Sequence, residues 1–242
     1  MMKRFAVAVC SVALLASSAF ATWDYFPPKD AGEGEAKLSF EYDMPAKKTS
    51  EMTLGVGARY GIIQGLEASL WLPVPLASSY HNPITDKSES VEKHAGLSVP
   101  EIGVRYWLDF GLGFFVDAML PVDTREGREP DFGLELGVQY STELTDQISL
   151  GSQATLLDLL DDGDIGLHLG LEVDYNLGAA APYLGLEFPN LLADGDFMFD
   201  LVIGCGMDVT DAISADLGVT LGIAGYGDNF PVTISVSGSF HF

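Results

Sequence analysis

The sequence has few of the residues that disulfide-bonded, nucleic-acid-binding or helical membrane proteins need. Its 242 residues include two cysteines, and 12 lysines and arginines against 35 aspartates and glutamates, a formal net charge of −23. Two cysteines make no disulfide framework. Phosphate binding needs clustered lysine and arginine, so nucleic acid is not an expected partner.

Long apolar runs are also missing. Beyond the first 21 residues, the longest stretch without charge is 68–85, and it contains Pro73, Pro75 and Pro83. A membrane-spanning helix needs about 20 apolar residues with few breaks. The sequence therefore predicts no spanning helix.

Motifs for cofactor, metal or catalytic chemistry are absent as well. The sequence has no phosphate-cradling glycine loop, no metal-spaced Cys/His set and no redox cysteine pair. Its four histidines are His81, His94, His168 and His241, and none falls in a recognisable Ser-His pattern. Nucleophilic catalysis needs a nucleophile and a base within hydrogen-bond reach. We therefore expect no cofactor, no metal and no catalytic residues.

An export signal occupies the N-terminus. Lys3 and Arg4 precede an apolar stretch at 5–15, and Ala19-Phe20-Ala21 has the small-x-small pattern of a cleavage site. We expect cleavage after Ala21.

The dominant pattern in the remaining chain is alternation of apolar and polar residues, which marks strands with one apolar face. Most of these strands are long enough to cross a bilayer when tilted, which takes about 9–11 residues. The twelve alternating segments are 36–44, 52–60, 66–74, 102–108, 112–122, 132–140, 148–156, 165–175, 182–188, 197–207, 213–221 and 232–242. A misread edge would change the count to ten or fourteen. A soluble sandwich would alternate too, with its apolar face inward.

The lengths of the connections favour a membrane barrel over a sandwich. Short turns at 61–65, 109–111, 141–146, 176–179 and 208–212 alternate with longer polar loops at 76–96, 123–130, 158–164, 189–196 and 224–230. Outer-membrane barrels have short periplasmic turns and longer outer loops. A sandwich has no reason to separate the two lengths in this way.

Aromatic residues recur at the periplasmic ends of the expected strands. Tyrosine prefers the membrane interface, where its ring meets lipid and its hydroxyl meets water. The expected girdle consists of Tyr60, Tyr106, Tyr140, Tyr175, Phe240 and Phe242. The last strand, VTISVSGSFHF, resembles the C-terminal signal read by the barrel assembly machinery of Gram-negative bacteria, so we expect that machinery and outer-membrane lipid as partners.

Two segments resemble the outer-membrane barrels grouped with the meta-pathway of phenol degradation. GVGARYGIIQGLEASLWLP and EIGVRYWLDFGLGFFVDAMLPVD share a glycine-rich strand ending in Tyr, a short turn and a strand ending in Leu-Pro at Pro73 and Pro121. Phe188-Pro189 is a weaker third case, and 98–101 replaces the Gly-Asp usual in the family. The resemblance implies an outer-membrane barrel and, by the family's name, a transporter of apolar aromatics.

These observations predict an all-β protein, an antiparallel transmembrane β-barrel of about 12 strands in the outer membrane of a Gram-negative bacterium. In hydrocarbon every backbone N–H and C=O must pair within the protein, so the sheet must close. The expected organisation is a signal peptide at 1–21, a segment at 22–34 that lies in the periplasm or plugs the lumen, and the barrel at 35–242, with both termini periplasmic.

If apolar residues face lipid, the polar faces enclose the lumen. Its ionisable groups then comprise twelve acids, three cations and one histidine. The residues expected to line the pore are Arg59, Glu67, Trp71, Glu101, Arg105, Asp117, Glu135, Glu172, Asp174, Glu187, Asp200 and Asp216. Rings of acidic side chains favour cations. The sequence thus favours a passive channel or transporter for small solutes, either cationic or neutral.

Two other functions remain open. The barrel is closed and acts as a structural or surface-interaction protein if side chains fill its lumen, since twelve strands make a narrow barrel. A lipid-modifying enzyme is the less favoured alternative. The sequence names neither the solute nor the oligomeric state.

Overall fold

The computed structural model describes residues 25–26, 29–46, 49–82, 87–91, 95–157, 159–160, 165–192 and 197–242. The expected signal peptide and its cleavage site lie outside these residues, as does His94. The part of the chain that the structure describes holds no helix long and apolar enough to cross a membrane.

Thirteen strands make up the described fold. They are β1 (Gly34–Ala46), β2 (Thr49–Ile63), β3 (Leu66–Asn82), β4 (Lys87–Val91), β5 (Glu101–Trp107), β6 (Leu112–Met119), β7 (Gly133–Thr145), β8 (Ile148–Leu157), β9 (Gly166–Tyr175), β10 (Ala180–Phe188), β11 (Phe199–Thr210), β12 (Ile213–Ala224) and β13 (Val232–His241). All strands except β4 form one ring in which neighbours are antiparallel, and β1 pairs with both β2 and β13. The prediction of a closed twelve-stranded antiparallel barrel is confirmed.

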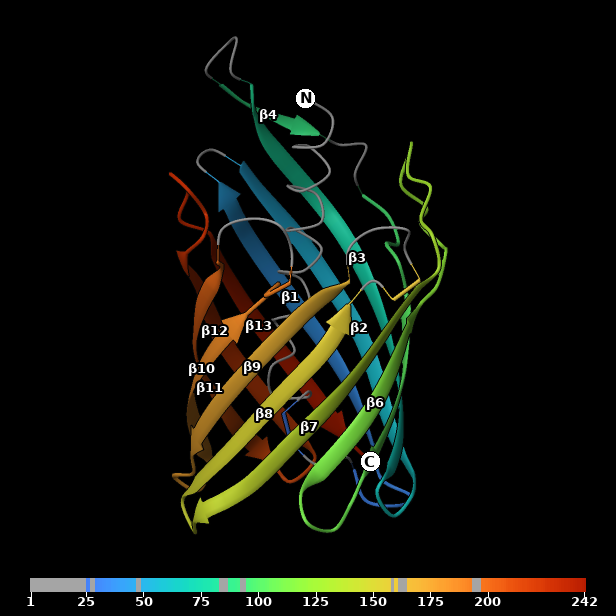
Figure 1. The fold of residues 1–242 in the computed structure, drawn as a ribbon, viewed down its shortest axis with the longest axis vertical. Coiled ribbons are helices and arrows are strands. Elements are labelled where there is room, and N and C mark those ends of the chain that lie inside the picture. Colours follow the sequence, from blue (N-terminus) through green and yellow to red (C-terminus); the bar gives the residue numbers. More distant parts are fainter. Residues whose placement is uncertain are drawn as a thin grey trace.

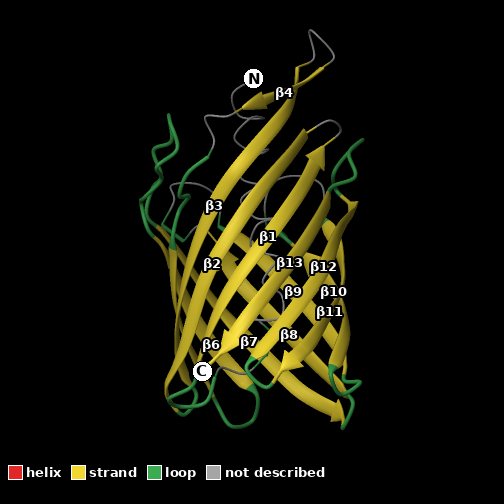
Figure 2. Cartoon of the chain, turned by 180° about the vertical axis from the view of Figure 1, so that it is seen from behind, coloured by secondary structure: helices red, strands yellow, loops and turns green. Residues whose placement is uncertain are grey.

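The strands cross the wall of the barrel at a tilt, as Figure 1 shows for β6 to β9. Figure 2 shows the opposite face, where β3, β2, β1, β13 and β12 lie side by side. Closure leaves no free sheet edge in the ring, which satisfies the backbone in a medium without water.

The two faces of the wall are those of an inside-out protein. Along β1, Leu38 is 54% exposed whereas Glu41 is 2% exposed, and along β6 Val116 is 42% exposed beside Asp117 at 5%. Apolar side chains therefore point outward and polar ones inward. A soluble sandwich has the reverse arrangement, so this exterior suits a bilayer.

The observed strands differ from the predicted ones mainly at the outer end. The segment 76–96, expected as a loop, is largely strand, because β3 continues to Asn82 and pairs with β4 in a hairpin above the ring. Polar residues such as Ser78 and Ser79 can form strand there because the backbone ladder, rather than an apolar face, holds the hairpin. Conversely, residues 120–122 were predicted as the end of a strand, but β6 ends before them at Met119.

At the periplasmic end three of the five turns, those after β2, β7 and β11, are tighter than predicted. Between β2 and β3 only Gln64 and Gly65 remain outside the strands, and Gly65 has φ +76°. This is the left-handed region that glycine enters at low cost. The C-terminus lies at this same end of the barrel (Figure 1).

Two outer connections are held together by hydrogen bonds. The amide of Thr124 donates to the carbonyl of Leu97 at 2.9 Å, and the Arg125 guanidinium donates to Ser98 at 2.8 Å and to Asp123. Burial raises the pKa of Asp123, but the hydrogen bonds and charge of Arg125 outweigh burial and hold that pKa below its ordinary value. A lowered folded-state pKa means that the pair stabilises the loop at neutral pH and loses this effect as the pH falls through that pKa.

Arg125→Ala is therefore expected to loosen the outer connection between β6 and β7 while leaving the unfolding temperature of the barrel unchanged. Limited proteolysis with a protease that does not cut at arginine should show faster cleavage there. Arg128→Ala is the matched control, since it removes the same charge, and the Arg128 guanidinium makes no hydrogen bond among the described residues. Equal cleavage of both variants would contradict the role of Arg125.

Candidate functional site: the lumen

The structure places all twelve of the expected pore-lining residues on the inner side of the wall. Glu67, Arg105, Asp117, Glu172, Glu187 and Asp200 are buried, and Arg59, Trp71, Glu101, Glu135, Asp174 and Asp216 are half-buried. Each lies on an inward position because side chains alternate along a strand. Ten of them lie on two walls of different charge, and Asp117 and Glu135 lie between these walls on β6 and β7.

The first wall, formed by β1, β2, β3 and β5, carries the inward lysine and arginines, Lys37, Arg59 and Arg105. Arg59 donates to Glu35 at 2.8 Å and lies 3.8 Å from Glu67. Arg105 stands opposite Glu67 in register and has the Phe115 ring 5.7 Å from its Cζ. Both arginines of this wall therefore have acids beside them.

The second wall, formed by β9 to β12, is acidic. It presents Glu172 and Asp174 from β9, Glu187 from β10, Asp200 from β11 and Asp216 from β12. No lysine or arginine follows Arg128 in the sequence. These strands consequently contribute no cation of their own, and the lumen is polarised from one wall to the other.

Tyrosines donate to three of the acids on this wall. Tyr183 donates to Asp216 at 3.1 Å, and Tyr226, from the connection after β12, donates to Asp200 at 2.5 Å. Tyr25 donates to Glu187 at 3.3 Å, although it precedes β1. A hydroxyl that donates to a carboxylate favours the charged form.

The segment before β1 enters the lumen. Tyr25 is 2% exposed and lies against Gly151 and Gly170 on the far wall. A Cβ added at Gly170 would come within 1.9 Å of the Tyr25 hydroxyl oxygen, so glycine leaves the space that the ring occupies. Lys29 is anchored at the periplasmic end, where its amide donates to Glu67 at 2.9 Å and its ammonium lies 3.1 Å from Glu35.

The structure places His241 beside a serine, a contact that no pattern in the sequence indicated. Its Nε2 lies 2.8 Å from the Ser214 hydroxyl, and its Nδ1 lies 3.7 Å from Glu35 and 3.1 Å from the Lys29 ammonium. Residues 214 and 241 meet only because β12 and β13 are neighbours, so spacing in the sequence gave no signal.

This arrangement does not suit a nucleophile and its base. An ammonium group only donates, so Nδ1 of His241 must accept from Lys29. The proton of the neutral ring is then on Nε2 and points to Ser214, where a general base needs a free lone pair. At 3.7 Å, Glu35 is also too far to orient the ring by a hydrogen bond. The cluster ties the segment before β1 to the barrel.

The six aromatic residues expected at the membrane interface are all exposed and lie toward the periplasmic end. Tyr60, Tyr106, Tyr140 and Tyr175 are between 41% and 47% exposed, and the rings of Phe240 and Phe242 stack with centroids 6.1 Å apart. The outer end has aromatic contacts that the sequence analysis missed, between Phe188 and both Phe197 and Phe199.

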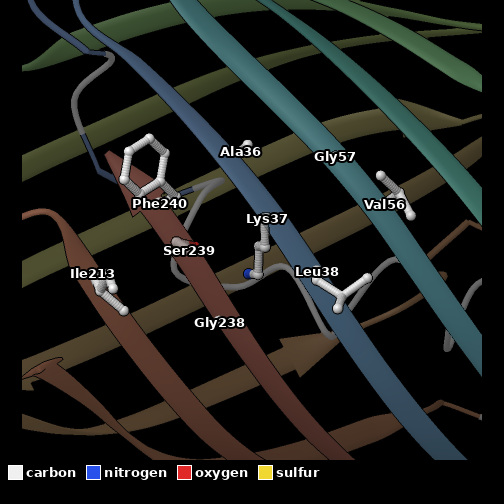
Figure 3. A pocket seen from close by; sticks show the side chains of 9 residues that line it. All are labelled: Ala36, Lys37, Leu38, Val56, Gly57, Ile213, Gly238, Ser239 and Phe240. Atoms are coloured by element: carbon white, nitrogen blue, oxygen red, sulfur yellow. The ribbon is translucent and has the colours of Figure 1, made fainter. Parts of the chain in front are cut away.

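A hollow of about 430 Å³ lies on the outside of the wall over β1, β2, β12 and β13. Phe240 and Ile213 flank it on one side and Leu38 and Val56 on the other, with Ala36 and Gly238 between them (Figure 3). Small residues leave this depression in the apolar belt. It is separate from the acidic wall, and its lining is mostly apolar, with Lys37 and Ser239 also at its border.

Sequence reasoning missed Glu35 and Tyr226, and it left open whether the segment that contains Tyr25 plugs the lumen or lies in the periplasm. Glu35 continues the inward parity of Lys37, so starting the first strand one residue earlier would have found it. The two tyrosines lie outside regular strands, where parity gives no signal. A hydrogen-bonded chain of inward, uncharged residues on β7 and β8 was also missed, because the sequence analysis considered ionisable groups. It consists of Gln139, Gln153 and Thr155.

Comparison with solved structures finds outer-membrane barrels. An outer-membrane channel from Pseudomonas putida F1 matches with a TM-score of 0.67 at 12% identity, over 90% of this chain and 98% of that one. The translocator domain of the autotransporter NalP from Neisseria meningitidis matches with 0.58 at 10% identity, over 99% and 98%. The CymD monoaromatic hydrocarbon channel matches with 0.51 at 10% identity, over 88% of each chain.

No family model and no curated protein matches the sequence. The similarity is therefore one of fold, and the protein has the twelve-stranded architecture of the outer-membrane channel from P. putida. Most of the similar barrels are described as channels, porins or translocators rather than enzymes.

Proposed function

We propose that the protein is a passive outer-membrane channel for small polar solutes that prefers cations. The observation that carries this proposal is the second wall, where five inward acids stand on strands that contribute no lysine or arginine. A lumen lined by one sign of charge between low-dielectric walls concentrates ions of the opposite sign.

The charged lining also bears on the class of solute. The resemblance to the phenol meta-pathway barrels and the similarity to the CymD monoaromatic hydrocarbon channel both suggest apolar aromatics. Buried acids such as Glu172 and Asp200, however, lose hydration when an apolar solute displaces the water around them. The lining therefore supports small cations and neutral polar solutes over hydrocarbons.

The segment 22–34 is proposed to narrow this channel. Two contacts support this proposal: Tyr25 reaches the acidic wall, and Lys29 binds at the periplasmic end. Residues 1–21 are proposed to be removed during export, and the C-terminal strand to be read by the barrel assembly machinery.

Reversal potentials in planar bilayers with a salt gradient test the selectivity. The purified protein, in potassium chloride, is expected to pass potassium in preference to chloride. Asp216→Asn combined with Asp174→Asn should lower that preference, because the variant removes two of the five charges of the wall. Exposed Asp109→Asn, in a periplasmic turn, is the control and should keep it.

An absence of conductance at every voltage would reject the channel and favour a closed structural or surface-interaction barrel. Anion preference would reject the role of the acidic wall. A phospholipase assay on the same preparation tests the enzymatic alternative. We expect only background hydrolysis of phospholipid, and Ser214→Ala should leave this rate unchanged.

A further inference from the structure

Glu187 and Asp200 are two buried acids that stand directly opposite each other on β10 and β11. Glu187 is 1% exposed and Asp200 is fully buried. Directly opposed residues in an antiparallel pair have Cβ atoms about 4.5–5.5 Å apart, and like charges in such a pair repel. Two charged carboxylates placed in this way repel each other, and a cation bound between them would remove that repulsion.

A tyrosine binds each acid on the side that faces away from the other acid. Tyr25 lies over Gly170 and donates to Glu187 Oε1, and Tyr226 lies against Gly222 and donates to Asp200 Oδ1. Gly170 and Gly222 are the register neighbours of Glu187 and Asp200 on the sides away from the pair. One oxygen of each carboxylate therefore accepts a hydrogen bond from a tyrosine that lies on the side away from the other acid.

Asp200 Oδ2 is the atom that points to a ligand. It is buried and accepts no hydrogen bond, and the Tyr226 hydroxyl is the hydrogen-bond donor that the structure gives this side chain among the described residues. No described lysine, arginine or histidine forms an ion pair with Asp200. Removing a carboxylate from water without a partner costs several kcal/mol, so we infer that a cation binds here.

We propose that Glu187 and Asp200 together form a binding site for a divalent cation of the calcium type. The donors are carboxylate oxygens, which suit hard cations rather than zinc or copper. Two carboxylates also match a charge of two. The described residues contain no group of three or more Asp, Glu, His or Cys that could hold a metal ion, so the remaining ligands of this cation would be water.

A site with two acidic side chains is expected to bind weakly, with a dissociation constant on the order of 10⁻⁴ to 10⁻³ M, as in extracellular calcium modules. Such an affinity suits calcium at a cell surface. The site lies toward the outer end of β10 and β11, and it requires neither an open lumen nor conduction.

Terbium luminescence tests the proposal on the full mature chain in detergent. Terbium replaces calcium, and Tyr25 and Tyr226 would sensitise its emission when tyrosine is excited. We expect a saturable signal that calcium competes away. Asp200→Asn and Glu187→Gln should each weaken terbium binding by about tenfold or more. Asp117→Asn, a buried inward acid on β6, is the matched control and should bind as the unmodified protein does.

Three outcomes would overturn the site. One is a signal that survives Asp200→Asn, which would place the terbium elsewhere. Another is the absence of any saturable signal. The third is an infrared band of a protonated carboxylic acid that Asp200→Asn removes, which would show a shared proton instead of a metal. A gel comparison of boiled and unboiled samples shows that each variant is folded. A non-conducting protein that still binds terbium would reject the channel and retain the site.

Discussion

Val116→Arg is expected to lower the free energy of unfolding of the barrel in lipid by about 2–4 kcal/mol. Val116 is 42% exposed in the middle of β6, and its register partners Val104 and Leu136 are exposed as well. An arginine there would lie in the hydrocarbon near the bilayer midplane, where its charge has no water. Unfolding with denaturant in lipid vesicles measures the loss.

Gln153→Arg is the matched control for this prediction. Gln153 points inward on β8, where it hydrogen-bonds to Gln139 and Thr155 and stands opposite Gly170. The same charge at this place meets polar groups and the acidic wall, so the free energy of unfolding should change by less than in Val116→Arg. Equal losses in the two variants would contradict the assignment of the outer face to lipid.

Deletion of residues 22–33 is expected to raise single-channel conductance several-fold. The deletion removes Tyr25 from the acidic wall and Lys29 from Glu35 and Glu67, while β1 keeps its first residue, Gly34. The widened lumen passes more current for the same driving force. Planar bilayer recordings at fixed salt give the comparison directly.

A comparison of Lys29→Ala with Glu33→Ala tests whether the contacts of Lys29 hold the segment before β1 in the lumen. Lys29→Ala removes the ammonium contacts with Glu35 and His241 and should raise conductance or its fluctuation in part. Glu33 is exposed, so Glu33→Ala should behave as the unmodified protein does. Unchanged conductance on deletion would show that the segment does not narrow the lumen. Another part of the lumen would then limit the conductance.

Most of the barrel could be predicted from the sequence because its signal is local. The period-two alternation of Leu38, Phe40 and Tyr42 reports which side of one strand is apolar, whatever that strand pairs with. The same parity placed Glu187 and Asp200 inside. Parity does not show where a strand begins. The first strand was predicted to begin at Ala36, so Glu35 was left out.

The polar hairpin of β3 and β4 was missed for a related reason. Its residues include Ser78 and Ser79, which show no apolar period, because above the ring both faces of the strand are outside the bilayer. Backbone pairing alone holds such a segment, and backbone hydrogen bonds leave little trace in the sequence.

The sequence by itself determined the architecture: twelve barrel strands, their two faces and the acidity of the interior, since each follows from neighbouring residues or from composition. Only the tertiary structure decided which inward groups meet. Tyr25 contacts Glu187 across 162 residues, and Lys29 contacts His241 across 212. These contacts depend on closure of the ring and on the path of the segment before β1, which no local pattern specifies. For the same reason the opposed pair of Glu187 and Asp200, with its two tyrosines, emerged from the fold alone.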